Sequence, residues 1–206
     1  RGEQVMKVTL LGISGGYPKA NGACSSYLVE ANGKKILLDM GSGSLSKLLD
    51  VISPNELDAI VLSHFHYDHC TDLLPFIYTI QMQRSSGIEI PNIPLYCLKN
   101  DSPLCGLICD DTVFDTNFVK AGQALDILGI RFSFFKTMHP VDCIAMRIEA
   151  EGKVLAYTAD SSKDSDCFEE LLSNADLAIM DCGELDASTS VKKNHMTPSD
   201  CHRISK

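Results

Sequence analysis

The sequence has no run of about 18 uncharged apolar residues, the length that a membrane-spanning helix needs. It therefore predicts no membrane span and no membrane partner. The first residues, Arg1 to Gln4, lead directly into strand-like sequence and lack the basic, apolar and small-residue regions of a signal peptide. On this basis we expect a cytoplasmic protein.

The chain also lacks internal repeats, low-complexity tracts and any linker rich in proline and serine. Its 206 residues are enough for one domain with a substantial core. Hydrophobic residues make up 45% and charged residues 22% of the chain, as in an average globular domain. We therefore expect a single domain over residues 1–206.

Closely spaced cysteine pairs and an excess of positive charge are missing as well. None of the nine cysteines belongs to a CxxC pair, which predicts reduced thiols rather than a zinc ribbon or a disulfide framework. The formal net charge of −9 argues against a general nucleic-acid binder, which needs a basic face. An anionic substrate stays possible, because bound divalent metals reverse the charge locally.

Short apolar runs dominate the rest of the sequence and predict more strands than helices. Asn32-Gly33 and Glu151-Gly152 are typical of tight hairpins. The expected strands are residues 5–11, 26–30, 35–39, 59–63, 94–98, 113–119, 124–128, 130–137, 143–149, 153–158 and 177–181. The expected helices are residues 44–52, 71–82, 165–173 and 198–206, which suggests helices layered on mixed sheets.

One segment contains a cluster of side chains that can bind a metal. His64, His66, Asp68 and His69 follow the apolar strand 59–63 within six residues. Because His64 and His66 are two apart, an extended backbone projects both to the same side. Imidazoles together with a carboxylate suit zinc first, with iron or manganese as alternatives. The segment therefore predicts a metal site.

The string HFHYDH at residues 64–69 resembles the HxHxDH signature of the metallo-β-lactamase superfamily. Residues 37–43 (LLDMGSG) resemble that family's strand ending in an aspartate and glycines, and His139 and Asp160 fall at the positions of later ligands. The resemblance spans about residues 5–200. It implies an α/β fold, a four-layer αβ/βα sandwich of two mixed sheets flanked by helices, with two metals in a cleft at one edge.

The resemblance also implies roles for individual residues. One metal would be bound by His64, His66 and His139, and the other by Asp68 and His69, with Asp160 bridging both. Asp68 is also expected to take part in catalysis. The metals would be two divalent ions, and a hydroxide bridging them would act as the nucleophile.

Asp39 would lie behind the metals and accept a hydrogen bond that orients the histidine loop. His202, beside Arg203 in the expected last helix, is interpreted as a surface residue.

Within the superfamily the ribonuclease Z-like branch is the most similar. Residues 11–18 resemble its glycine-rich opening, and residues 194–197 (NHMT) resemble its His-Ser-Thr segment, whose histidine donates a proton to the leaving group. His195 is therefore a candidate catalytic residue. Residues 178–182 (AIMDC) stand where ribonuclease Z has His-Glu-Ala-Thr, and the chain has no room for the long arm that grips transfer RNA. Transfer RNA is therefore not the expected partner.

The superfamily supplies a last histidine ligand after one further helix and strand. We expect it beyond Lys206, so that the domain lacks its C-terminal end; the alternative is that His195 takes its place. The expected function is a phosphodiester hydrolase acting on a small or nucleotide-type anionic substrate. The alternatives are a lactone or thioester hydrolase, which Tyr67 keeps open, and a non-catalytic metal-binding scaffold. Residues 81–94 and 99–112 are candidate lids. The oligomeric state stays open, with a homodimer among the states considered.

Overall fold

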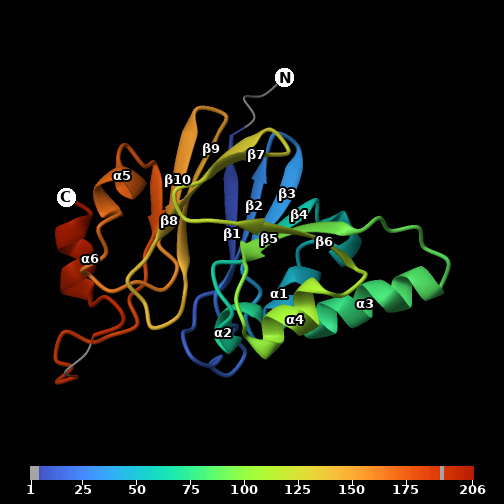
Figure 1. The fold of residues 1–206 in the computed structure, drawn as a ribbon, viewed down its shortest axis with the longest axis horizontal. Coiled ribbons are helices and arrows are strands. Elements are labelled where there is room, and N and C mark those ends of the chain that lie inside the picture. The colour runs from blue at the N-terminus through green and yellow to red at the C-terminus, as the bar shows by residue number, and fades with distance from the viewer. Residues whose placement is uncertain (1–4, 191–192) are drawn as a thin grey trace. The chain divides into compact units, whose positions relative to one another are not determined.

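The computed structural model describes residues 5–190 and 193–206. The chain divides into two compact units, residues 6–118 and residues 119–206, with Val5 belonging to the second. Each unit is built around one sheet that mixes parallel and antiparallel strands (Figure 1). Among the described residues, no helix combines the length and apolar character needed to cross a membrane.

The unit of residues 6–118 has a six-stranded sheet in the order β1-β2-β3-β4-β5-β6. Its strands are β1 (Lys7–Gly12), β2 (Ser26–Ala31), β3 (Lys34–Leu38), β4 (Ala59–Val61), β5 (Ile93–Leu98) and β6 (Phe114–Val119). Its helices are α1 (Ser44–Leu49), the 3-10 helix η1 (Pro54–Glu56), α2 (Tyr67–Cys70), α3 (Leu73–Ser85) and α4 (Pro103–Cys109). β3, β4 and β5 run parallel, so their carboxyl ends meet at one edge of the sheet.

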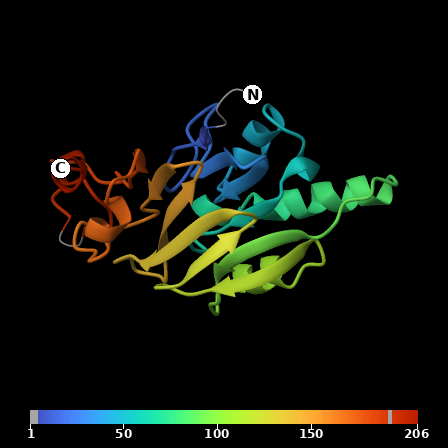
Figure 2. The ribbon, with the colours of Figure 1, turned by 90° about the horizontal axis from the view of Figure 1, so that it is seen from above.

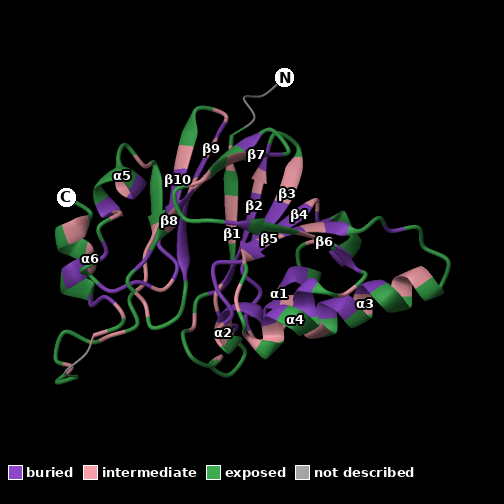
Figure 3. Ribbon diagram, in the orientation of Figure 1, coloured by how far each residue is buried: buried purple, intermediate pink, exposed green. Residues whose placement is uncertain are grey.

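The core of this unit lies between one face of the sheet and the helices. Leu37 and Ile60 on neighbouring strands, Leu48 of α1 and Phe76 of α3 belong to one buried apolar cluster. In Figure 1 the helices α1, α3 and α4 lie together along the sheet, and Figure 3 shows that β2, β3 and β4 are mostly buried. Pro75 occupies the first turn of α3, where its missing N–H costs nothing.

One expectation for this unit is wrong in part. Residues 99–112 were predicted as a candidate lid, but they contain α4, whose Cys105, Ile108 and Cys109 are buried in the core. Ser102 caps this helix by accepting a hydrogen bond from the backbone N–H of Leu104. The helix was missed because its buried face is made largely of cysteines, which carry little helical signal.

The unit of residues 119–206 has a five-stranded sheet in the order β11-β10-β9-β8-β7. Its elements are β7 (Ala124–Ile127), β8 (Ile130–Lys136), β9 (Ile144–Ala150), β10 (Lys153–Tyr157), α5 (Phe168–Leu172), β11 (Leu177–Ile179) and α6 (Pro198–Ile204). Phe168 and Leu171 of α5 pack with Ala145 and Ala156 of the sheet, and Ile204 of α6 packs on the same cluster. Figure 2 shows these two helices, orange to red, gathered beside the strands of this unit.

Both predicted hairpins are confirmed by their backbone angles. Asn32 and Gly33 have φ of 51° and 70°, and Glu151 and Gly152 have φ of 53° and 68°. Positive φ at both central residues is the two-residue turn that matches the twist of paired strands. None of the nine cysteines forms a disulfide, as the sequence predicts.

Helix α6 begins with a capping box. The Thr197 hydroxyl accepts a hydrogen bond from the N–H of Asp200, whose carboxylate accepts the N–H of Thr197. Replacing Thr197 with alanine is expected to lower the free energy of unfolding by about 1 kcal/mol, because a buried helix-end N–H loses its acceptor. Urea denaturation measures this loss. Ser199→Ala in the same turn should change stability by less than about 0.5 kcal/mol, and equal losses in both variants would contradict the cap.

Candidate metal centre

The predicted histidine segment connects β4 to α2. His66 keeps an extended backbone, with φ of −67° and ψ of 149°, and the single turn of α2 then brings Asp68 and His69 back toward His64. The ring centroids of His64 and His66 are 4.7 Å apart, and those of His64 and His69 are 4.2 Å apart. Oδ2 of Asp68 lies 3.9 Å from Nε2 of His69. Four donor side chains therefore gather in a small volume, as the spacing predicts.

Asp39 holds this segment in place. It follows β3, and Ser63 follows the parallel neighbour β4, so the parallel pairing brings the two residues together. The buried Asp39 carboxylate accepts hydrogen bonds from the N–H of Ser63 at 2.7 Å and from its hydroxyl at 2.8 Å. It lies 2.8 Å from Nδ1 of His69, and the Ser63 hydroxyl lies 3.0 Å from Nδ1 of His64.

These contacts set the tautomers of two imidazoles. Because the Asp39 carboxylate only accepts, Nδ1 of His69 is the donor. The Ser63 hydroxyl gives its proton to Asp39, so Nδ1 of His64 donates to Ser63. In both rings the Nε2 lone pair is then the one suited to bind a metal. The predicted role of Asp39 as the acceptor behind the histidine loop is confirmed.

Gly41 lets the chain after β3 pack against α2. A Cβ atom at this position would overlap the carbonyl oxygen of Asp68. The neighbouring Met40 N–H donates to the carbonyl of His69 at 2.7 Å, so this backbone has little freedom to move away. The N–H of Gly16 donates to Oδ2 of Asp68 at 2.6 Å from the other side. The glycine-bearing segments noted in the sequence thus lie beside the predicted ligands.

Replacing Gly41 with alanine is expected to displace the Asp68 peptide. Overpacking of this kind costs typically about 1–3 kcal/mol, and we expect a matching fall in metal content. Gly15→Ala is the matched control, because a Cβ there has no neighbour within 4 Å. Thermal unfolding and metal analysis of both variants test this expectation. A Gly41→Ala protein with normal metal content would contradict it.

The second unit presents its own donor group. His139 lies in the loop between β8 and β9, and its side chain is only 1% exposed. Its Nε2 atom is 3.6 Å from Oδ2 of Asp160, which follows β10. The Thr137 hydroxyl donates to the carbonyl of Asp160 at 2.8 Å and joins the two loops. These two residues, far apart in sequence, are therefore neighbours.

Asp181 is a functional candidate that the sequence analysis did not select. β10 and β11 are parallel, so Asp160 and Asp181, which follow them, meet at one edge. Oδ2 of Asp181 lies 2.8 Å from Nδ1 of His195. The hydrogen bond to Asp181 raises the pKa of His195 above its ordinary value, and the nearby Asp160 adds to this effect. The sequence did contain a signal for Asp181: it is a carboxylate at the end of an expected strand, within residues 178–182, where the chain differs from ribonuclease Z.

Asp160, Asp181 and His195 each offer a ligand atom within 4.8 Å of one another. The rings of His139 and His195 also approach, with centroids 5.4 Å apart. Carboxylates and imidazoles in both units are the donors that zinc, iron and manganese accept. The donor set therefore fits divalent metal binding. His202 is exposed on α6, as predicted.

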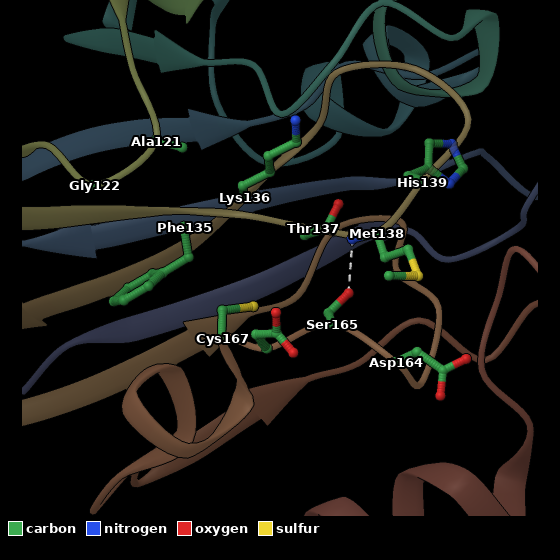
Figure 4. A pocket seen from close by; sticks show the side chains of 11 residues that line it. Ala121, Gly122, Phe135, Lys136, Thr137, Met138, His139, Asp164, Ser165 and Cys167 are labelled. Carbon is green, nitrogen blue, oxygen red and sulfur yellow. Dashed lines mark hydrogen bonds between the residues drawn. The ribbon is translucent and has the colours of Figure 1, made fainter.

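A cavity of about 630 Å³ opens beside the His139 loop. Figure 4 shows Phe135 and Cys167 at one end of it and His139 at the other, with Lys136 and Asp164 on opposite sides. The volume is in the range of small-molecule sites. The side chains around it are mixed in charge, so the cavity by itself favours no single class of ligand.

Comparison with known proteins places this chemistry in a family. The model of the beta-lactamase superfamily domain matches residues 34–206. The chain belongs to the metallo-β-lactamase superfamily. It is 35% identical over 201 residues to a probable metallo-hydrolase, YhfI, of Bacillus subtilis, covering 98% of this chain and 82% of that protein. It is also 28% identical over 148 residues to ribonuclease Z of Methanopyrus kandleri, covering 71% of this chain and 50% of the relative.

Solved structures support the same assignment. The crystal structure of Bacillus subtilis YhfI, described as a metallo-β-lactamase fold protein, aligns with a TM-score of 0.91 at 35% identity, covering 98% of this chain and 81% of that one. Human tRNase Z, short form, shares the fold with a TM-score of 0.79 at 20% identity, covering 98% and 88%. The expected superfamily and its two mixed sheets with flanking helices are confirmed. Family and donor chemistry together identify a metal-dependent hydrolase.

Proposed function

We propose that this metallo-β-lactamase superfamily protein cleaves phosphodiester bonds at a dinuclear metal centre. In this proposal His64, His66 and His139 bind one ion, Asp68 and His69 bind the other, and Asp160 is shared. Zinc suits the donors best, with iron or manganese as alternatives. Bound ions would supply a hydroxide near neutral pH and offset charge on the phosphoryl oxygens.

The observation that carries the proposal is the Asp181–His195 pair. Departure of an alkoxide from phosphorus needs a proton, and the carboxylate of Asp181 raises the pKa of His195, which keeps its imidazole protonated to higher pH. With Nδ1 directed to Asp181, Nε2 is the atom that would deliver the proton. Asp181 would orient the ring and stabilise its charged form.

The residues around the ligands support the proposal by holding them rigidly. Asp39 orients the rings of His64 and His69 through their Nδ1 atoms. The N–H of Gly16 fixes one oxygen of Asp68. Preorganised donors lower the cost of assembling the site before each turnover.

A carbon-ester hydrolase of the same fold is the second candidate. Tyr67 is 71% exposed next to Asp68, and its phenol could serve a lactone or thioester as a hydrogen-bond donor. A lactone also expels an alkoxide that needs a proton, so the His195 pairing fits both candidates. Similarity to ribonuclease Z favours the phosphodiester.

The test compares the two chemistries in one preparation. The full-length protein is analysed for metal content and then assayed with bis(p-nitrophenyl) phosphate and with a simple lactone. We expect close to two ions per chain and cleavage of the phosphodiester. Strong lactone turnover without phosphodiester cleavage would overturn the proposal in favour of the second candidate. Fewer than two ions per chain would argue against the dinuclear centre.

A further inference from the structure

Three buried serines, Ser161, Ser162 and Ser165, follow Asp160 in the loop between β10 and α5. Ser161 is fully buried and Ser165 is 8% exposed. The Ser165 hydroxyl accepts a hydrogen bond from the N–H of Met138 at 2.7 Å, drawn as a dashed line in Figure 4. Met138 directly precedes His139, so this bond holds the Thr137–Met138 peptide, one residue before a proposed ligand.

The bond belongs to a closed ring of hydrogen bonds. The hydroxyls of Ser165 and Ser161 are 2.8 Å apart, and the Ser161 hydroxyl also reaches the carbonyl of Ser162 at 3.2 Å. The N–H of Ser162 donates to the carbonyl of Met138 at 2.9 Å. A single proton direction satisfies every member: Met138 N–H to Ser165, Ser165 to Ser161, and Ser161 to the Ser162 carbonyl. Both backbone groups of Met138 are therefore held by this loop.

The same loop reaches the proposed proton donor. The N–H of Ser161 donates to Oδ2 of Asp181 at 2.9 Å, the oxygen that also faces His195. Asp160, which precedes Ser161, is itself bound through its carbonyl to Thr137. The serine loop is thus connected to His139 through Met138, to Asp160 through the backbone, and to His195 through Asp181.

We propose that Ser165 is a positioning residue that fixes the direction in which His139 presents its imidazole. The inference rests on the proposed role of His139 as a metal ligand. Loss of the Ser165 hydroxyl would leave the Met138 N–H and the Ser161 hydroxyl each short of a partner, and an unsatisfied buried polar group is costly. The Thr137–Met138 peptide would then turn to find another acceptor, and the backbone and ring of His139 would shift with it.

The test uses three variants. Ser165→Ala removes the acceptor, and Ser165→Thr keeps a hydroxyl. Ser162→Ala is the matched control, because Ser162 is equally buried in the same loop but holds Met138 through its backbone N–H. Two measurements are made: hydrogen exchange of the Met138 amide in metal-free protein, and the affinity and visible absorption spectrum of bound Co²⁺.

For Ser165→Ala we expect faster exchange at Met138, about 10-fold weaker Co²⁺ binding and an altered spectrum, as is typical when a partner behind a metal ligand is lost. Ser165→Thr should restore all three, and Ser162→Ala should match the parent protein. A Ser165→Ala protein with normal Co²⁺ affinity and spectrum would overturn the inference, even if its melting temperature fell.

If Ser165→Ala does not fold, Ser161→Ala is used to test the inference. This variant removes the hydroxyl that accepts the hydrogen bond from Ser165. A smaller shift of Co²⁺ affinity in the same direction supports the inference, and an unchanged spectrum opposes it. Normal Co²⁺ binding without phosphodiester cleavage in the parent protein would count against the proposed reaction only.

Discussion

Replacement of His195 by alanine is expected to lower kcat about 10²- to 10⁴-fold for a phosphodiester whose leaving group is an alkoxide. With bis(p-nitrophenyl) phosphate the same variant should lose less than about 10-fold, because p-nitrophenolate leaves with little need for a proton. The difference between the two substrates is the signature of a proton donor. Steady-state rates of metal-loaded protein, with metal content measured in each preparation, check it.

The control for this variant is His202→Ala, which removes an exposed imidazole from α6 and should leave both rates unchanged. Equal losses with both substrates in His195→Ala would contradict proton donation. Equal losses together with lower metal content would instead indicate that His195 is a metal ligand, a role that its grouping with Asp160 and Asp181 makes chemically reasonable.

The pH dependence tests the partner of His195. The protonated imidazole is the donor, so activity with the alkoxide substrate is present below the raised pKa of His195 and is lost as pH rises through it. Asp181→Asn removes the charge that raises this pKa, which should then fall toward its ordinary value of 6.5. The alkaline limb of the kcat profile is therefore expected to move to lower pH. A limb that stays in place would exclude His195 as the titrating group.

Replacement of Asp39 by asparagine is expected to weaken metal binding about 10- to 100-fold, the usual effect of losing a hydrogen-bond partner behind a metal ligand. The amide has one acceptor oxygen, whereas the Asp39 carboxylate serves both Ser63 and Nδ1 of His69 with two. The NH₂ group would face a donor, and His69 could change its tautomer. Competition with a chelator measures the affinity.

A matched control for this change is Asp50→Asn, because Asp50 is an exposed aspartate at the end of α1. It should bind metal as the parent protein does. Asp39→Asn should also lose about 1–3 kcal/mol of unfolding free energy in the metal-free state, since a buried polar group is left unsatisfied. Unchanged chelator competition would show that the histidine loop keeps its geometry without Asp39.

Features that depend on neighbours in the sequence could be predicted. The Asn32-Gly33 and Glu151-Gly152 turns follow from residues that accept positive φ. The gathering of His64, His66 and His69 follows from an extended backbone that enters a single helical turn. Helix α4 could not be predicted in this way. Its buried face contains two cysteines, and only their packing in the core of the folded unit shows that this face is apolar.

The sequence by itself determined the metal chemistry of this protein, because four donors within six residues need only local geometry to converge. The tertiary structure decided which residues support them. Asp39 reaches Ser63 through the pairing of the parallel strands β3 and β4, and Asp181 comes to lie beside Asp160 in the same way across β10 and β11. Such contacts depend on strand order and register, which residues distant in the chain establish only when the sheets have formed.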